Sequence, residues 1–287
     1  MIAYEKHINK NSNEWITLVH GAGGSSSIWN KQIDYFSEYF NLLLVDLRGH
    51  GKSAQSHLNV TKYSFNAVTK DILEVLDKEK ILHSHFVGIS LGSLIIRNFA
   101  NLYPERVTSC VLGGMITKIN FFSKVLLFYA NLLINILPVQ TLYKILANLI
   151  LPRKSHNASK QKYIVEAKKI TTEEFFKWFN LNKEIKNLLR SFNKICPVPL
   201  LIIQGQEDHL FVNDVKKYVE IFKNVNLKVL PKCGHVVNIQ SAELFNKYAL
   251  SFMQSHKKVK ESITKTVVKD QTSKDLKNAV SKPVTTT

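Results

Sequence analysis

Hydrophobic residues occur along this chain in short runs that do not alternate with polar ones. Such runs are typical of strands that are buried on both faces of a parallel sheet. Between them, apolar residues recur at helical intervals over 28–39, 65–80 and 91–102. The alternation predicts an α/β fold: a doubly wound, mostly parallel sheet covered by helices, with a site at the carboxyl ends of its strands. The predicted strands are 15–19, 42–45, 86–89, 107–112, 199–203 and 227–230.

This alternation of strands and helices stops after the fourth predicted strand, 107–112, and residues 121–151 are mostly apolar. Lys124, Asn131 and Asn135 are spaced as one polar stripe of a helix, and Pro138 interrupts the run. Both observations favour two helices of a lid over a membrane-spanning helix. A capping box at 171–174 then predicts a helix that carries Phe175 and Phe179. An interfacial contact of this apolar lid with a membrane stays open as an alternative.

These patterns divide the chain into four segments. Residues 1–115 and 196–256 are expected to form the two parts of an α/β core, and 116–195 a helical cap. Residues 257–287 contain eight lysines and three acidic residues without a hydrophobic period, which predicts a basic, disordered tail.

Composition narrows the functional classes. The 287 residues are 45% hydrophobic, enough for a sizeable core, and the net charge is +17. Lysine is spread over the whole chain without a nucleic-acid-binding motif, so we expect no nucleic-acid partner. Three scattered cysteines predict neither a disulfide framework nor a metal cluster, and residues 1–21 lack the pattern of a secretory signal; both favour the cytoplasm.

The strand that ends near residue 89 leads directly into G-x-S-x-G at 88–92, followed by helix-forming residues. A strand, a sharp turn and a helix in this order are typical of a nucleophile elbow, in which the serine side chain is exposed at the turn. Ser90 is therefore the candidate nucleophile.

A serine hydroxyl needs a base to accept its proton, and imidazole is suited to this near neutral pH. His235 follows the last predicted strand and is the candidate base. Asp208 follows the preceding strand and is the candidate acid that orients the ring, with Glu207 and Asp214 as competitors. The order of serine, acid and histidine along the chain is the one that this kind of elbow requires.

The negative charge that develops on a substrate carbonyl oxygen needs hydrogen-bond donors. The backbone N–H of Leu91, directly after the serine, and that of Ala22, in the glycine-rich turn after residue 19, are the candidates. His20 and His50 are interpreted as hydrogen-bonded loop histidines, and Asp46 and Arg48 as a local ion pair.

Together these segments resemble the α/β-hydrolase fold family, in its lid-bearing serine esterase and C–C hydrolase type. The matching pieces are H-G-A-G-G-S-S at 20–26, D-L-R-G-H-G-K-S at 46–53, G-I-S-L-G-S at 88–93, G-Q-E-D at 205–208 and G-H at 234–235. The resemblance implies a helical cap inserted after the family's sixth strand. The chain departs from the family in one place, since there is room for only one strand, over 2–8, ahead of residue 15.

The sequence therefore predicts a carboxylesterase-like serine hydrolase that cleaves esters of small to medium apolar acyl groups through an acyl-enzyme, with no cofactor and no metal. Phe128, Phe175 and Phe179 of the lid are expected to line the acyl site. The alternative is the same triad used as a lyase, a lactonase or a C–C bond hydrolase; a ligand-binding receptor or scaffold is disfavoured. The expected partner is a small-molecule ester, with a weak membrane-surface contact through the lid or tail left open and the oligomeric state undetermined.

Overall fold

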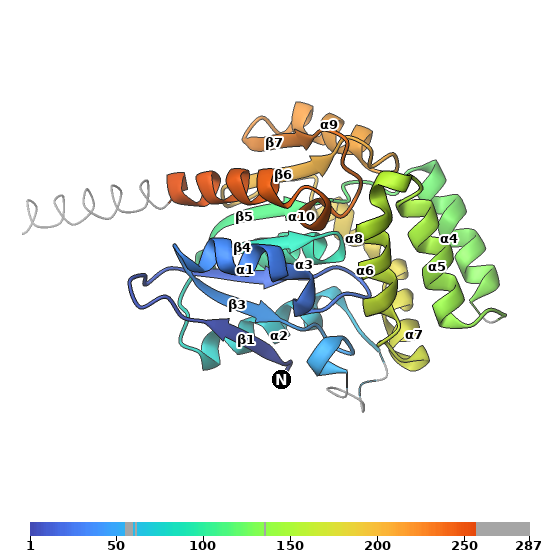
Figure 1. The fold of residues 1–287 in the computed structure, drawn as a ribbon, viewed down its shortest axis with the longest axis horizontal. Helices are drawn as coiled ribbons and strands as arrows, with labels where there is room; N and C mark the ends of the chain where they lie inside the picture. The colour runs from blue at the N-terminus through green and yellow to red at the C-terminus, as the bar shows by residue number, and fades with distance from the viewer. Residues whose placement is uncertain (55–59, 61, 135, 257–287) are drawn as a thin grey trace, which may run out of the picture.

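The computed structural model describes residues 1–54, 60, 62–134 and 136–256, so the predicted tail at 257–287 lies outside the described residues. A seven-stranded sheet forms its centre (Figure 1). The strand order is β1-β3-β2-β4-β5-β6-β7, with β1 antiparallel to β3 and every other neighbouring pair parallel. The strands are β1 (Tyr4–His7), β2 (Trp15–Val19), β3 (Asn41–Val45), β4 (Ser84–Ile89), β5 (Val107–Gly113), β6 (Leu200–Gly205) and β7 (Val225–Leu230). The predicted doubly wound, mostly parallel sheet is confirmed.

The runs without alternation correspond to strands with no exposed face. Every residue of β3, β4, β5 and β6 is buried, whereas β7 at the edge of the sheet has three exposed positions. A strand that is covered on both faces gains from apolar side chains at each position, which removes the polar half of the usual alternation. Hydrophobic patterning therefore located the inner strands well.

Helices cover both faces of the sheet and form two separate apolar clusters with it. One face carries α1 (Asn30–Ser37), α10 (Val237–Gln240) and a last helix over 242–256, with Phe36 and Phe245 in its cluster. The other face carries α2 (Phe65–Lys78), α3 (Leu91–Leu102) and α9 (Val212–Ile221), with Ile72 and Ile95 in its cluster. The sheet thus lies between two layers of helices (Figure 1).

Among the described residues, five α-helices are inserted between β5 and β6 and lie together beside the sheet (Figure 1). They are α4 (Phe121–Leu133), α5 (Val139–Ile150), α6 (Asn157–Ala167), α7 (Thr172–Asn180) and α8 (Asn182–Ser191). The insertion follows the fifth strand of this chain rather than a sixth, because one strand, β1, precedes β2. As the sequence predicts, a break at Pro138 separates α4 from α5, and the Thr171 side chain caps α7 by accepting from the Glu174 N–H at 3.2 Å.

Hydrogen bonds hold this insertion over the loops at the carboxyl ends of the strands. The Ser25 hydroxyl, after β2, donates to Glu166 Oε2 of α6 at 2.7 Å. The Trp178 indole N–H of α7 donates to the Arg48 carbonyl oxygen, after β3, at 2.9 Å. Since parallel strands place these loops at one edge of the sheet, the insertion covers the region where a site is expected.

The membrane-spanning alternative for residues 121–151 is tested by helix length. Among the helices of the described residues, none combines the length and the apolar character that crossing a bilayer requires. The two helices α4 and α5 instead pack as parts of the insertion.

Candidate active site

Ser90 lies at the turn between β4 and α3 with a backbone conformation that is unusual for a residue with a side chain. Its φ is 54° and its ψ is −117°, in the positive-φ region that favours glycine. Two residues on, Gly92 permits this turn, because a Cβ atom there would lie 2.2 Å from the Val19 carbonyl oxygen. The Ser90 N–H donates to the Gly113 carbonyl oxygen at 2.9 Å, which ties the turn to β5. The predicted elbow is therefore present.

His235 and Asp208 come from the loops after β7 and β6 and meet Ser90 in one chain of hydrogen bonds. His235 Nε2 lies 2.8 Å from Ser90 Oγ, and His235 Nδ1 lies 2.7 Å from Asp208 Oδ2. Asp208 is fully buried and His235 is nearly so. Because a carboxylate only accepts hydrogen bonds, Nδ1 carries a proton and donates it to Asp208, which leaves Nε2 free to accept from the Ser90 hydroxyl.

Neither competitor of Asp208 contacts the ring. The Glu207 carboxylate lies 2.9 Å from His156 Nε2 and 2.6 Å from Arg153 Nη1, and the hydrogen bond with His156 holds the pKa of this carboxyl below its usual range. Asp214, in the first turn of α9, accepts from Asn120 Nδ2 at 3.0 Å. The structure thus brings together the three residues that the sequence ranked first.

A further residue, Gln204, holds the acid in place, and the sequence reasoning did not identify it. Gln204 Nε2 donates to Asp208 Oδ2 at 2.5 Å, while its Oε1 accepts from the Met115 N–H at 3.0 Å. The Met115 donor fixes which end of the amide faces Asp208. Its signal in the sequence is a single polar residue within the buried run of β6.

The glycine-rich loop that carries Ala22 is braced by two buried histidines. His50 Nε2 accepts from the Gly23 N–H at 3.0 Å, and His20 Nε2 accepts from the Leu47 N–H at 3.0 Å. Both rings donate through Nδ1, to the carbonyl oxygens of Arg48 and Gly21 respectively. Burial lowers the pKa of both, that of His50 to about 3, so both rings are neutral and fit the sequence interpretation of loop histidines.

One sequence interpretation of this region is wrong. Arg48 does not pair with Asp46 but forms a bidentate ion pair with Asp71 of α2. Asp46 accepts backbone N–H bonds instead, from Ser26 at 2.6 Å and from Lys52 at 2.7 Å. The carboxylate of Asp46 therefore organises two loops, while the partner of Arg48 comes from a separate helix.

Three adjoining cavities lead from Ser90 into the insertion. The Ser90 cavity, about 120 Å³, is lined by Ala22, Ser90 and His235 together with residues of α5 and α6. The middle cavity, about 220 Å³, shares Ala22 with it and also meets Leu91, the first residue of α3. Ala22 and Leu91 thus lie beside Ser90, and the role of their N–H groups toward a substrate oxygen stays a prediction.

The lid cavity, about 640 Å³, lies between α4, α5 and α7 and is almost wholly apolar. Phe175 and Phe179 line both the lid cavity and the middle cavity, and their rings stack at 5.9 Å. Phe128 is 66% exposed, packs edge-on against Tyr129, and lines none of these three cavities. Its helix turns Phe128 outward, so of the three lid residues the structure brings only Phe175 and Phe179 together.

Helix α6, which the sequence analysis did not predict, contributes Tyr163 and Glu166 to the Ser90 cavity. Burial raises the pKa of the Tyr163 phenol. Burial also opposes ionisation of Glu166, but hydrogen bonds from Ser25 and Lys169 outweigh it and hold the pKa of this carboxyl below its usual range. Glu166 is therefore ionised at neutral pH, and its charge is balanced by Lys169 at 3.0 Å and Lys162 at 3.6 Å.

Within residues 1–54, 60, 62–134 and 136–256, no three His, Cys, Asp or Glu side chains are grouped so as to hold a metal ion. The structure brings Ser90, His235 and Asp208 together in one chain of hydrogen bonds. Such a chain makes a hydroxyl a nucleophile, because the ring accepts its proton and the acid stabilises the resulting imidazolium.

Known proteins resemble the chain over most of its length. A 2-hydroxy-6-oxononadienedioate/2-hydroxy-6-oxononatrienedioate hydrolase of Burkholderia vietnamiensis is 28% identical over 267 residues, which cover 84% of this chain and 88% of that protein. The fold is similar to the crystal structure of an enol-lactonase from Burkholderia xenovorans, with a TM-score of 0.72 and 22% identity over 88% of this chain and 96% of that one. A carboxylesterase from Nitrososphaera gargenis gives a TM-score of 0.71 and 20% identity over 89% and 95%.

A family model described as the alpha/beta hydrolase fold matches residues 14–242, which contain β2 to β7, the elbow and the loops of Asp208 and His235. On this match, and with the sheet and helical insertion described above, the chain belongs to the alpha/beta hydrolase fold family.

Proposed function

We propose that this protein is a serine hydrolase that cleaves carboxylic esters of small to medium apolar acyl groups through an acyl-enzyme intermediate. The observation that carries the proposal is the hydrogen-bonded chain from Ser90 Oγ through His235 to Asp208. Ser90 has a positive φ and contacts a buried imidazole that is itself paired with a buried carboxylate. A serine that only completed a turn would need neither feature.

In the acylation step, Ser90 Oγ attacks the ester carbonyl carbon while His235 Nε2 accepts the hydroxyl proton. Asp208 stabilises the imidazolium that forms, and the backbone N–H groups of Ala22 and Leu91 donate to the oxyanion. When the tetrahedral intermediate collapses, the bond to the leaving oxygen breaks and His235 returns the proton to the departing alcohol. Water then attacks the acyl-enzyme by the same route, which releases the acid and restores Ser90.

The three cavities support an apolar acyl group. Phe175 and Phe179 line the two outer cavities, and Leu146 of α5 lines both as well. Each methylene that leaves water for such a surface contributes about 0.8 kcal/mol, or roughly a fourfold gain in affinity. The apolar lining of the lid cavity favours uncharged acyl groups over dicarboxylic ones, because a second carboxylate would lose its hydration there.

A second candidate keeps the same triad and changes the bond that is broken. The relative from Burkholderia vietnamiensis is named as a hydrolase of 2-hydroxy-6-oxononadienedioate, and a structural neighbour is an enol-lactonase. A lactone is an internal ester and needs no new residue, whereas C–C bond hydrolysis needs the leaving carbon to be protonated. A panel of esters, lactones and vinylogous diketones separates these activities.

The nucleophile is tested with a fluorophosphonate probe, which labels an activated serine covalently. We expect Ser90→Ala to abolish labelling and to lower ester turnover by several orders of magnitude. The matched control is Ser159→Ala, which removes a buried hydroxyl that lines the same cavity and has no hydrogen-bond partner within the described residues. Full labelling of Ser90→Ala, or its loss in Ser159→Ala, would contradict the assignment, and a folded protein that is never labelled would point to a receptor or scaffold.

A further inference from the structure

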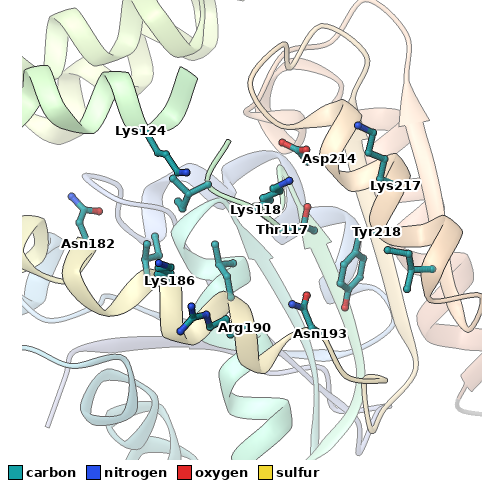
Figure 2. A pocket seen from close by; sticks show the side chains of 14 residues that line it. Thr117, Lys118, Lys124, Asn182, Lys186, Arg190, Asn193, Asp214, Lys217 and Tyr218 are labelled. Atoms are coloured by element: carbon teal, nitrogen blue, oxygen red, sulfur yellow. The ribbon is translucent and has the colours of Figure 1, made fainter. Parts of the chain in front are cut away.

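A separate hollow of about 660 Å³ lies where the insertion meets the core (Figure 2). Helix α8 of the insertion forms one wall and α9 of the core the other, with residues 117–119 and the start of α4 between them. None of Ser90, His235 or Asp208 lines it. We call this hollow the basic pocket, for the charges described next.

Five cationic side chains surround the basic pocket, as Figure 2 shows: Lys118, Lys124, Lys186, Arg190 and Lys217. They come from four different segments, so no single run of lysines produces the cluster. Of the described residues that line the pocket, only Asp214 is acidic, and it accepts a hydrogen bond from Asn120. The pocket therefore carries a large local excess of positive charge.

Some cations of the insertion pair with carboxylates: Lys169 lies 3.0 Å from Glu166, and Lys177 lies 2.8 Å from Glu173. The five pocket cations differ from the rest of the basic surface because they line one hollow from four segments. Within the part of the chain that the structure describes, none of the five pocket cations forms an ion pair. Five like charges around one hollow repel one another, and a bound anion would relieve that repulsion.

The remaining lining is of two kinds. Ile119, Ile185, Leu189 and Ile221 give the pocket apolar walls. Thr117 adds a hydroxyl oxygen that is shielded from solvent and has no hydrogen-bond partner among the described residues. The combination suits a ligand with a charged group and an apolar body better than it suits an inorganic ion alone.

We propose that the basic pocket binds an organic phosphate: a phosphate ester whose anionic oxygens meet the lysines and Arg190 and whose apolar part packs against the isoleucines. A phosphate offers several acceptor oxygens and up to two negative charges, which matches a hollow that cations line from four segments. The guanidinium of Arg190 can donate two parallel hydrogen bonds to such a group. A carboxylate has a single charge and would leave most of these donors without a partner.

Binding there would connect the two halves of the molecule, since Lys186 and Arg190 belong to the insertion and Lys217 to the core. Asn182 and Ile185 line both the basic pocket and the middle cavity, so the ligand would lie one layer of side chains away from the proposed acyl route. The phosphate proposal does not depend on hydrolysis at Ser90, because binding can be measured on its own.

The test is isothermal titration of the full chain with octyl phosphate below its micellar concentration, at two salt concentrations. The pocket variant is Lys186→Glu combined with Arg190→Glu, which changes two exposed side chains four residues apart on α8. The matched control is Lys70→Glu combined with Lys247→Glu, two exposed lysines that do not line the pocket and that produce the same change of net charge. Octyl glucoside replaces the phosphate with an uncharged group.

We expect octyl phosphate to bind the wild type and the control alike and to bind the pocket variant at least about tenfold more weakly, because charge-assisted hydrogen bonds are lost. Lys186→Gln with Arg190→Gln should fall between them, and octyl glucoside should not bind. Protection of Lys186 and Lys217 from acetylation by the bound ligand would locate it.

Two further probes distinguish the source of the phosphate. Competition by inorganic phosphate indicates a small soluble ester, whereas pocket-dependent binding to phosphatidylglycerol vesicles alone indicates a lipid headgroup. Equal weakening in the pocket and control variants would show attraction by net charge only and would overturn the proposal. Undiminished binding to the pocket variant, or no binding of any of the three phosphate probes, would overturn it as well.

Discussion

Replacing Asp208 by asparagine tests how the buried acid is held, because the structure predicts which way the new amide points. In the wild type, Oδ2 accepts from both His235 and Gln204, while Oδ1 has no hydrogen-bond partner among the described residues. Asparagine has one oxygen and one NH₂ group. With the oxygen toward His235 and Gln204, both hydrogen bonds survive and the NH₂ group occupies the place of the unpartnered Oδ1.

The loss of activity then comes from the missing negative charge and not from a change in the position of the ring. A hydrogen bond to a charged group contributes about 1.5–3 kcal/mol and one between neutral groups about 0.5–1.5 kcal/mol. The difference, about 1–2 kcal/mol, corresponds to a decrease in kcat/KM of roughly 5- to 30-fold. In the opposite amide orientation, the NH₂ group would face His235 and force the wrong imidazole tautomer. In serine proteases the corresponding change lowers kcat about 10⁴-fold.

Gln204 decides between these orientations, because its own NH₂ group faces the acid and would clash with a second donor. We therefore expect Asp208→Asn combined with Gln204→Leu to lose more activity than the two single variants predict together. The assay is kcat/KM on a p-nitrophenyl ester for the wild type, both single variants and the double variant, with circular dichroism to confirm folding.

Two results would refute this reasoning. A loss near 10⁴-fold in Asp208→Asn alone, with no further effect of Gln204→Leu, would mean that Gln204 does not orient the amide. A loss below twofold would mean that Asp208 is not the partner of His235 during catalysis.

Three further predictions follow from the cavities and charges. In a series of p-nitrophenyl esters, kcat/KM should rise about fourfold per methylene from acetyl toward medium chains, and Phe179→Ala should flatten the rise; a maximum at acetyl would contradict an apolar acyl site. Glu166→Gln leaves Lys169 and Lys162 without their carboxylate beside the Ser90 cavity, so it should reduce the preference for a butyryl over a monosuccinyl ester about tenfold. The measure is the ratio of kcat/KM values, which exposed Glu173→Gln should leave unchanged. The pKa of Glu207 is lower in the folded than in the unfolded chain, because the folded carboxylate pairs with His156. This pairing stabilises the fold at pH values above the ordinary pKa of a glutamate, and the stabilisation is lost as the pH falls through the folded-state pKa. Thermal melting should therefore show a smaller drop below about pH 4.5 in Glu207→Gln than in the wild type, and identical profiles would rule out this contribution.

The sequence predicted the inner strands and the elbow because both depend on local rules. A strand buried on both faces must be apolar throughout, and a turn at positive φ with close backbone neighbours needs glycine at 88 and 92 around Ser90. The positions of Asp208 and His235 followed in the same way, since each comes directly after a strand end.

The features that the sequence did not reveal depend on tertiary contacts. Helix α6 has no apolar stripe, because it buries polar side chains such as Ser159 and Glu166 against the core loops. Arg48 meets Asp71 rather than the nearer Asp46, since α2 packs against the loop after β3. Phe128 points outward although its neighbours on α4 line the lid cavity, and hydrophobicity alone does not show which way an apolar side chain faces in a helix that is apolar nearly all round.

The paired imidazoles of His20 and His50 support the glycine-rich loop after β2 in their neutral forms, because burial lowers the pKa of both rings. Each ring links an amide proton on one side to a carbonyl oxygen on the other, so it works as a rigid spacer only in its neutral form. A proton added to His50 would turn its accepting nitrogen into a donor that faces the Gly23 N–H, but with a pKa of about 3 this occurs only in strong acid. Histidine is the residue that most often acts as a pH sensor, but these two rings hold a loop in place without titrating near neutral pH. Changes of activity near neutral pH are therefore expected from other groups.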